Sequence, residues 1–218
     1  MEQVKVPFVQ IARAAELAQQ GSMPNEMRTI QATASSALGL IESYALSLRL
    51  QGKLIPLELE PITISSLLYD AAHEISSFAN QYHVELELDT GPKIGPIIAD
   101  RAVLHAALTS LGYLFVEATA NPDDRAVVKL AAHHGRYGVV AGLYTGVHDF
   151  GADSLRRARA LQGRARQPLQ HLTTSPAAGV FVADALLHTL STKLHVARYH
   201  KLTGLATTLT QSQQMQLV

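Results

Sequence analysis

Apolar residues recur at helical spacing across the middle of this chain. Leu104, Leu108, Leu111 and Phe115 follow one another at intervals of three and four residues. This spacing predicts a helix with one side against a core. The apolar run Ile97-Ile98-Ala99 in front of it predicts a short strand that leads directly into the helix.

Two further helical patterns lie in the N-terminal part, at residues 4–20 and 26–50, and Gly21 and Pro24 break the chain between them. Their apolar positions are also three and four residues apart, which predicts an antiparallel helical hairpin. Two such hairpins could close a four-helix bundle in a homodimer, and the alternative is an ordinary helical pair packed on its own domain. The residues that we expect at the dimer interface are Phe8, Ile11, Ala15, Ala18, Ile30, Ala34, Ala37 and Ile41.

The remainder of the chain mixes helical and strand patterns. A helix is predicted at residues 65–81, followed by a strand at 83–89 with Val84, Leu86 and Leu88 on one face. Two more strands, at 127–133 and 138–145, are joined by a turn, and a helix at 180–190 precedes strands at 193–199 and from Gly204 onward. We therefore expect an α+β protein, with a helical hairpin at residues 1–54 and an α/β sandwich at residues 55–218.

Composition narrows the classes of function. The 218 residues are 47% hydrophobic, which is enough to bury a core, and they include no cysteine for a disulfide, a thiolate metal site or a nucleophile. Ten histidines are present without the spacing of a metal motif. The N-terminus lacks the pattern of a signal peptide, and no stretch reaches the roughly eighteen apolar residues of a membrane span. We expect a cytoplasmic protein without a metal.

Charge is divided unevenly along a chain whose net charge is zero. Residues 1–126 carry 8 basic and 15 acidic residues, and residues 127–218 carry 10 basic and 3 acidic residues. This asymmetry indicates an interface or an anionic partner on the second part.

Around the central helix the sequence resembles the N box, with which sensor histidine kinases open their ATP-binding domain. Asp100, Leu104 and Leu108 match this pattern. The two asparagines of the family fall on Ser110 and Leu114, and the second of them holds the Mg²⁺ of Mg-ATP in the family. Leucine has no oxygen to offer this hard cation. The resemblance therefore implies the sandwich of the histidine kinase-like ATPases but alters its chemistry.

The hairpin is similar to the dimerisation and phosphotransfer module of the same family. Residues 59–64 (LEPITI) also match the linker that joins this module to the ATP-binding domain. The family's phosphoacceptor histidine falls on Glu2 in the register that we prefer and on Asn25 in a competing register. Neither side chain can replace the imidazole nitrogen that attacks a phosphoryl group.

The two glycine boxes of the family are also recognisable but altered. The first retains Asp149, which binds adenine in the family, and Gly151, but Asp153 replaces the second glycine. A carboxylate there would repel a polyphosphate. The second box retains only Gly179. The resemblance thus implies that Asp149, Gly151, Gly179 and Ser110 are remnants of a nucleotide site; we expect no cofactor, although ATP could still dock there.

Between these boxes lies the segment that corresponds to the family's ATP lid, residues 153–174. Its arginines could bind phosphates, an acidic protein surface or nucleic acid, but no aromatic residues are interleaved with them to stack on bases. A solvated charged loop is the alternative. The five candidate partner-binding residues are Arg156, Arg157, Arg159, Arg164 and Arg166.

These patterns together predict a degenerate histidine kinase. We expect a non-catalytic pseudokinase or adaptor in two-component signalling, which forms a homodimer and contacts a response regulator or another signalling protein. One alternative is a divergent kinase or phosphotransferase that still binds ATP through Asp149. Another is a regulator that binds anions or nucleic acid through the arginine-rich segment.

Overall fold

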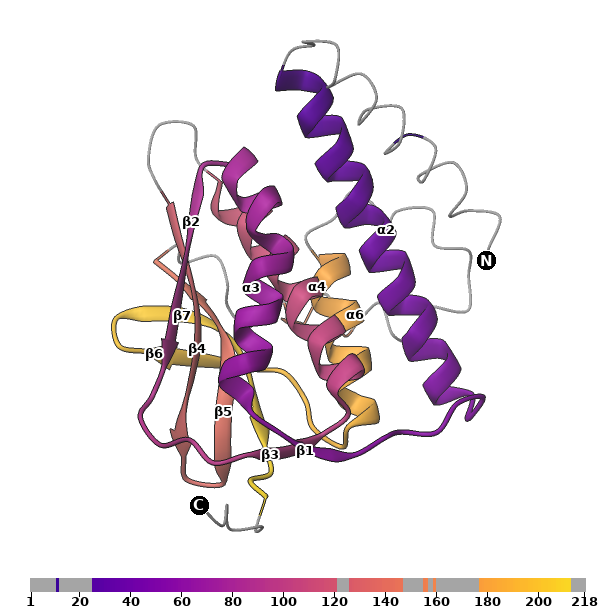
Figure 1. The fold of residues 1–218 in the computed structure, drawn as a ribbon, viewed down its shortest axis with the longest axis vertical. Coiled ribbons are helices and arrows are strands. Elements are labelled where there is room, and N and C mark those ends of the chain that lie inside the picture. The colour runs from indigo at the N-terminus through magenta and orange to yellow at the C-terminus, as the bar shows by residue number, and fades with distance from the viewer. Residues whose placement is uncertain are drawn as a thin grey trace.

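Five strands form one mixed sheet in the order β2-β4-β5-β7-β6 (Figure 1). The computed structural model describes residues 25–120, 126–146 and 177–212, together with Ile11, Leu155, Arg156 and Arg159. Only the pair β2–β4 is parallel, and the other three pairs are antiparallel. The strands are β2 (Val84–Thr90), β4 (Ala126–Gly135), β5 (Gly138–Thr145), β6 (His195–Tyr199) and β7 (Leu202–Leu209).

Three helices cover one face of this sheet, and a fourth lies outside them (Figure 1). The covering helices are α3 (Ile64–Gln81), α4 (Arg101–Thr119) and α6 (Ala177–Thr189), and the outer helix is α2 (Asn25–Gln51). A small antiparallel pair, β1 (Glu60–Ile62) and β3 (Ile97–Ala99), brings the linker after α2 to the start of α4. The chain is therefore layered as sheet, three helices and one long outer helix.

The core lies between the sheet and helix α4. Leu104, Leu111 and Phe115 are each at most 1% exposed, and alternate residues of β4 such as Leu130 and Ala132 face them from the sheet. By length and composition alone α4 could cross a membrane, but 67% of it is buried inside the protein. Such burial is typical of the central helix of a globular core.

Close contact between β5 and β7 depends on small residues. A Cβ atom added at Gly204 would lie 1.9 Å from the Leu143 carbonyl oxygen, and one at Gly142 would lie 2.4 Å from the Leu205 carbonyl oxygen. Glycine is therefore needed at both positions.

On the other face of the sheet, the ring of Tyr199 of β6 lies near one residue of β4 and one of β5, beyond the intervening strand β7. Its ring centroid is 5.1 Å from that of His133 and 5.3 Å from that of Tyr144. Tyr144 is fully buried, and neither its hydroxyl nor His133 Nδ1 has a hydrogen-bond partner. Tyr144 and Tyr199 belong to a second, much smaller hydrophobic cluster with Ala131 and Ala206.

The predicted α+β fold is confirmed, with three differences. Strand β1 was not expected, because three residues of a linker give no periodicity to read. Strand β4 continues to Gly135, so that only Arg136 and Tyr137 form the turn, and α6 begins three residues earlier than predicted. The helical hairpin is only partly visible: α2 is present, whereas the helix expected at residues 4–20 lies outside the described residues apart from Ile11, which is helical.

Candidate functional site

Asp100 fixes the start of helix α4. Its Oδ1 accepts a hydrogen bond from the Val103 N–H at 3.1 Å, which caps the helix, and its Oδ2 accepts one from the Glu58 N–H at 2.9 Å. Aspartate is well suited to this capping position, because its carboxylate satisfies an N–H group that the helix leaves unpaired. Asp100 is 8% exposed, and both of its carboxylate oxygens are used to hold the linker to the start of α4.

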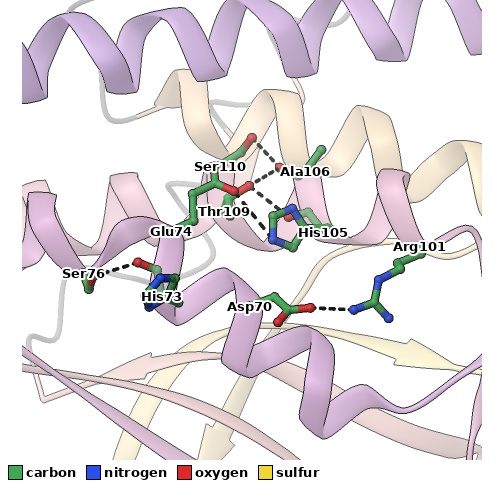
Figure 2. Close-up of polar contacts among 9 residues, drawn as sticks. All are labelled: Asp70, His73, Glu74, Ser76, Arg101, His105, Ala106, Thr109 and Ser110. Atoms are coloured by element: carbon green, nitrogen blue, oxygen red, sulfur yellow. Dashed lines mark hydrogen bonds and ion pairs between the residues drawn. The ribbon is translucent and has the colours of Figure 1, made fainter.

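Ser110 and Leu114, which stand where the resemblance places the two asparagines, lie on the side of α4 that faces α6. Ser110 is 2% exposed and Leu114 is 4% exposed. The Ser110 hydroxyl donates to the Ala106 carbonyl of its own helix at 2.7 Å, as Figure 2 shows. The hydroxyl is thus bound within its own helix.

Gly179, near the start of α6, touches α4 at this same point. A Cβ atom there would lie 2.8 Å from the Ser110 carbonyl oxygen and 3.0 Å from Leu114 Cβ. Helix α6 therefore rests directly on α4 at Ser110 and Leu114, and Gly179 is buried. The structure brings Ser110 and Gly179 together, but as packing partners. Asp149 and Gly151 lie outside the described residues.

The contact of Gly179 with Ser110 and Leu114 presents no polar side chain suited to bind a metal or a phosphate. Leu114 presents only carbon, and the Ser110 oxygen is already bonded to its own helix. A hard cation such as Mg²⁺ needs several oxygen ligands. Nowhere in the described parts of the chain do three His, Cys, Asp or Glu side chains gather to hold a metal ion.

An ion pair at the opposite side of α6 was not foreseen. Arg159 donates from Nε and Nη2 to the two carboxylate oxygens of Asp184, at 3.1 and 3.2 Å, and Nη2 also donates to the Leu194 carbonyl at 2.8 Å. The Asp184 carboxylate, whose side chain is 6% exposed, accepts a further bond from the Leu194 N–H at 3.1 Å. The pair holds residue 159 against α6 and the start of β6. Asp184 is the single acidic residue in the apolar run of α6. This pattern in the sequence indicates a buried carboxylate that needs a basic partner.

Arg159 was predicted to bind a partner, and the structure places it in this internal pair. Arg156 is exposed and makes an interaction of its own, and nearby Leu155 is buried in the main core. Arg157, Arg164 and Arg166 lie outside the described residues.

The side of α4 that faces α3 is polar and partly exposed (Figure 2). Arg101 pairs with Asp70 at 2.5 Å, and His105 Nε2 lies 3.6 Å from a Glu74 carboxylate oxygen. Burial, and secondarily the charge of Glu74, raise the pKa of Tyr113 to about 12. His73, which precedes Glu74, stacks instead on Tyr69 at the surface.

The predicted dimer-interface residues of α2 are placed unequally. Ile30 is 45% exposed, Ala37 and Ile41 are half-buried, and Ala34 is 5% exposed. Ile11 is 44% exposed. Phe8, Ala15 and Ala18 lie outside the described residues.

Comparison with known proteins finds similarity to solved structures but not to family models or curated sequences. No protein-family model matches the sequence, and no curated protein matches it. Solved structures match well, among them the Acinetobacter baumannii histidine kinase AdeS, with a TM-score of 0.56 at 10% identity over 94% of this chain and 95% of that one. The chain has the fold of a histidine kinase core.

Other histidine kinases agree with this fold. Full-length ShkA in complex with AMPPNP gives a TM-score of 0.58 at 18% identity over 97% of this chain, which spans only 45% of the ShkA chain. The catalytic domain of ThkA gives 0.51 at 10% identity over 72% of this chain and 98% of that one. Identities this low establish the histidine-kinase-like fold and leave activity to be argued from the site.

Proposed function

We propose that this histidine-kinase-like core is non-catalytic, and that it acts as a pseudokinase or adaptor which dimerises and binds a response regulator or another signalling protein. The observation that carries this proposal is the contact of Gly179 with Ser110 and Leu114, at 2.8 and 3.0 Å from a Cβ atom placed on the glycine. It occupies the point at which the family resemblance places the metal ligand of Mg-ATP.

Phosphoryl transfer is almost entirely a matter of positioning and of charge stabilisation by metal and backbone. Here the metal-ligand position is the apolar Leu114, which is 4% exposed. The sequence also lacks a histidine at both positions in which a phosphoacceptor could stand, Glu2 and Asn25. Because the chain has no metal ligand at position 114 and no histidine at either acceptor position, we expect no phosphoryl transfer from ATP.

Incubation with Mg-ATP labelled on the γ-phosphate tests the absence of catalysis. We expect no labelled protein and no release of phosphate above a buffer control. A labelled band that disappears in the variant Asp149→Asn would instead support a divergent kinase that docks ATP on the first glycine box.

The exposed face of α2 supports dimerisation. Its inward side is made of small residues such as Ser43, 8% exposed, and Ser47, fully buried, which let α2 lie close to the other helices. Of its larger apolar residues, Tyr44, Leu46 and Leu50 also pack against the core, whereas Ile30 is 45% exposed. Uncovered apolar side chains along a helix are typical of an interface with another helix.

Light scattering tests this part of the proposal. The double variant Ile30→Glu/Ile41→Glu places charges on the proposed interface, and we expect it to shift a dimeric protein to a monomer. Leu54→Glu is the control, because Leu54 is 75% exposed in the turn after α2 and lies outside the proposed seam. A dimer that survives the double variant would argue against this interface.

Fewer than the five predicted arginines remain candidates for binding a partner, because Arg159 pairs with Asp184. The carboxylate of Asp184 is buried, and replacing Arg159 would also disturb the fold. The variant for this test therefore replaces the exposed Arg156 and its neighbour Arg157 with alanine. If the partner is a nucleic acid, the affinity of the wild type should fall steeply with salt. A protein adaptor would bind with a weaker dependence on salt.

We propose a cytoplasmic location for either role.

A further inference from the structure

A groove of about 830 Å³ lies where the end of α2, the linker that follows it and helix α6 meet. Its floor is apolar and well packed, with Phe181 3% exposed and Ala185 2% exposed. The ring of Tyr44 lies against Phe181 with 5.7 Å between centroids. Leu48 stands at its edge, 38% exposed. A hollow of this size with an apolar floor is typical of a site for a small molecule.

The described residues that line the groove include basic side chains but no acidic ones. Its basic residues are Lys53, from the turn after α2, and His188, near the end of α6. No carboxylate stands among the described residues that line it. An acid group entering this groove would therefore meet a cation and no repelling charge, whereas a cationic ligand would find no partner.

The backbone at Lys53 is unusual for a lysine. Its φ is 54°, in the left-handed region where glycine is the unstrained residue, and its N–H donates to the Leu50 carbonyl at 3.0 Å to end the helix. The glycine of this turn, Gly52, comes one residue before the left-handed position, which Lys53 occupies. A side chain held in a strained conformation at the edge of a cavity points to a use for that side chain.

We propose that this groove binds a small organic anion with an apolar body, such as a fatty acid or an aromatic acid. Its acid group would pair with Lys53, and its body would lie on Phe181 beside Leu48. A small ligand fits better than a protein partner, because twelve of the described residues line the groove and a stable protein interface uses about 20–30 on each side. Since α2 and α6 form the groove together, the ligand would couple the hairpin to the sandwich. This inference holds whether or not nucleotide binds.

Fluorescence titration with anilinonaphthalene sulfonate tests the proposal, because this dye has an apolar body and one acid group. The wild type is compared with Lys53→Gly and Leu48→Glu. The matched control is Lys93→Gly, because Lys93 is also an exposed lysine with a left-handed φ, 58°, but lies in the loop between β2 and β3. Near-ultraviolet circular dichroism verifies that each protein keeps its native packing, since the dye also binds partly unfolded states.

We expect saturable binding of one dye per chain, displaced by dodecanoate. Lys53→Gly should bind about fivefold more weakly, the upper end for an exposed ion pair, while its backbone is relieved and its melting temperature does not fall. Leu48→Glu should weaken binding at least as much, and Lys93→Gly should bind like the wild type. Equal binding by all four proteins, or no saturable binding, would overturn the proposal. So would displacement by an acidic helical peptide but not by dodecanoate, which would assign the groove to a protein partner.

Discussion

The two sides of helix α4 differ in polarity and in burial. Toward α3 the helix carries polar pairs at the surface, such as Arg101 with Asp70 and His105 with Glu74 (Figure 2). Toward α6 it presents Ser110 and Leu114, both buried, and Gly179 rests on them. The side of α4 on which the family resemblance would place the ligands of Mg-ATP is thus packed against α6, whereas the side toward α3 carries partly exposed polar pairs.

The largest expected effect comes from comparing the partly buried ion pair on α6 with the exposed pair between α3 and α4. Asp184→Ala removes the partner of Arg159 and leaves the Leu194 N–H without an acceptor. Breaking a buried pair costs several kcal/mol, and since the Arg159 side chain is 41% exposed we expect a loss of about 2 kcal/mol in the free energy of unfolding. Urea denaturation measures it.

Asp70→Ala is the matched variant on the α3 side. Both side chains of the Asp70–Arg101 pair are more than 40% exposed, so its loss should cost at most about 1 kcal/mol. Equal costs for the two aspartates would mean that the deeper burial of the Asp184 carboxylate adds nothing to the stability that its pair contributes.

The second test adds one methyl group where α6 meets α4. Gly179→Ala places a Cβ atom 2.8 Å from a backbone oxygen, which cannot move aside as a flexible side chain would. We expect the variant to lose about 1–3 kcal/mol of stability, as for other overpacked sites. Gly146→Ala is the control, because nothing lies within 4 Å of its added Cβ atom. A stable Gly179→Ala protein would mean that α6 can move away from α4.

The third test restores the missing asparagine. Leu114→Asn places an amide at a position that is 4% exposed, and we expect a loss of about 1–3 kcal/mol for burying unpaired polar atoms. We also expect no gain in Mg-ATP binding, because Gly179 still occupies the contact. Glu117→Asn, on the exposed end of the same helix, controls for the amide. Recovered nucleotide binding in Leu114→Asn would show that one side chain, and not the packing, closes the site.

The smallest expected effect is a dependence of stability on pH from the outer face of the sheet. Burial, and then the neighbouring His134 and His200, lower the pKa of His133 below its usual range. The folded protein therefore favours the neutral ring, so this contribution is present above the ordinary histidine pKa of about 6.5 and is lost as pH falls below it. Denaturation midpoints measured across this range should fall less for His133→Gln than for the wild type. An unchanged slope would mean that His133 titrates normally.

Periodicity was sufficient to predict most of the fold. The apolar positions of α4 face the core as expected, since burial of apolar surface sets this pattern. In β2 the alternation holds only at the start of the strand, because Val84 is buried and Leu86 half-buried but Leu88 is 43% exposed. Strand β1 escaped because it exists only through its pairing with β3, which is a contact between distant residues.

The site was less predictable than the fold. The sequence indicated that Ser110 and Leu114 differ from the family pattern, but not that α6 would lie against them, because helix packing depends on the arrangement of all three helices. Arg159 read as one of five similar arginines, and only the structure distinguishes it through its pairing with Asp184. Charge alone does not reveal which member of a cluster has a buried partner.

Calorimetric titration with ATP and with a non-hydrolysable analogue, each with and without Mg²⁺, tests the central claim most directly. A closed contact between α6 and α4 predicts no heat of binding up to millimolar nucleotide under any of these conditions. Binding at micromolar concentration that depends on Mg²⁺ would contradict the account, because it would require an open site with metal ligands at the position of Leu114.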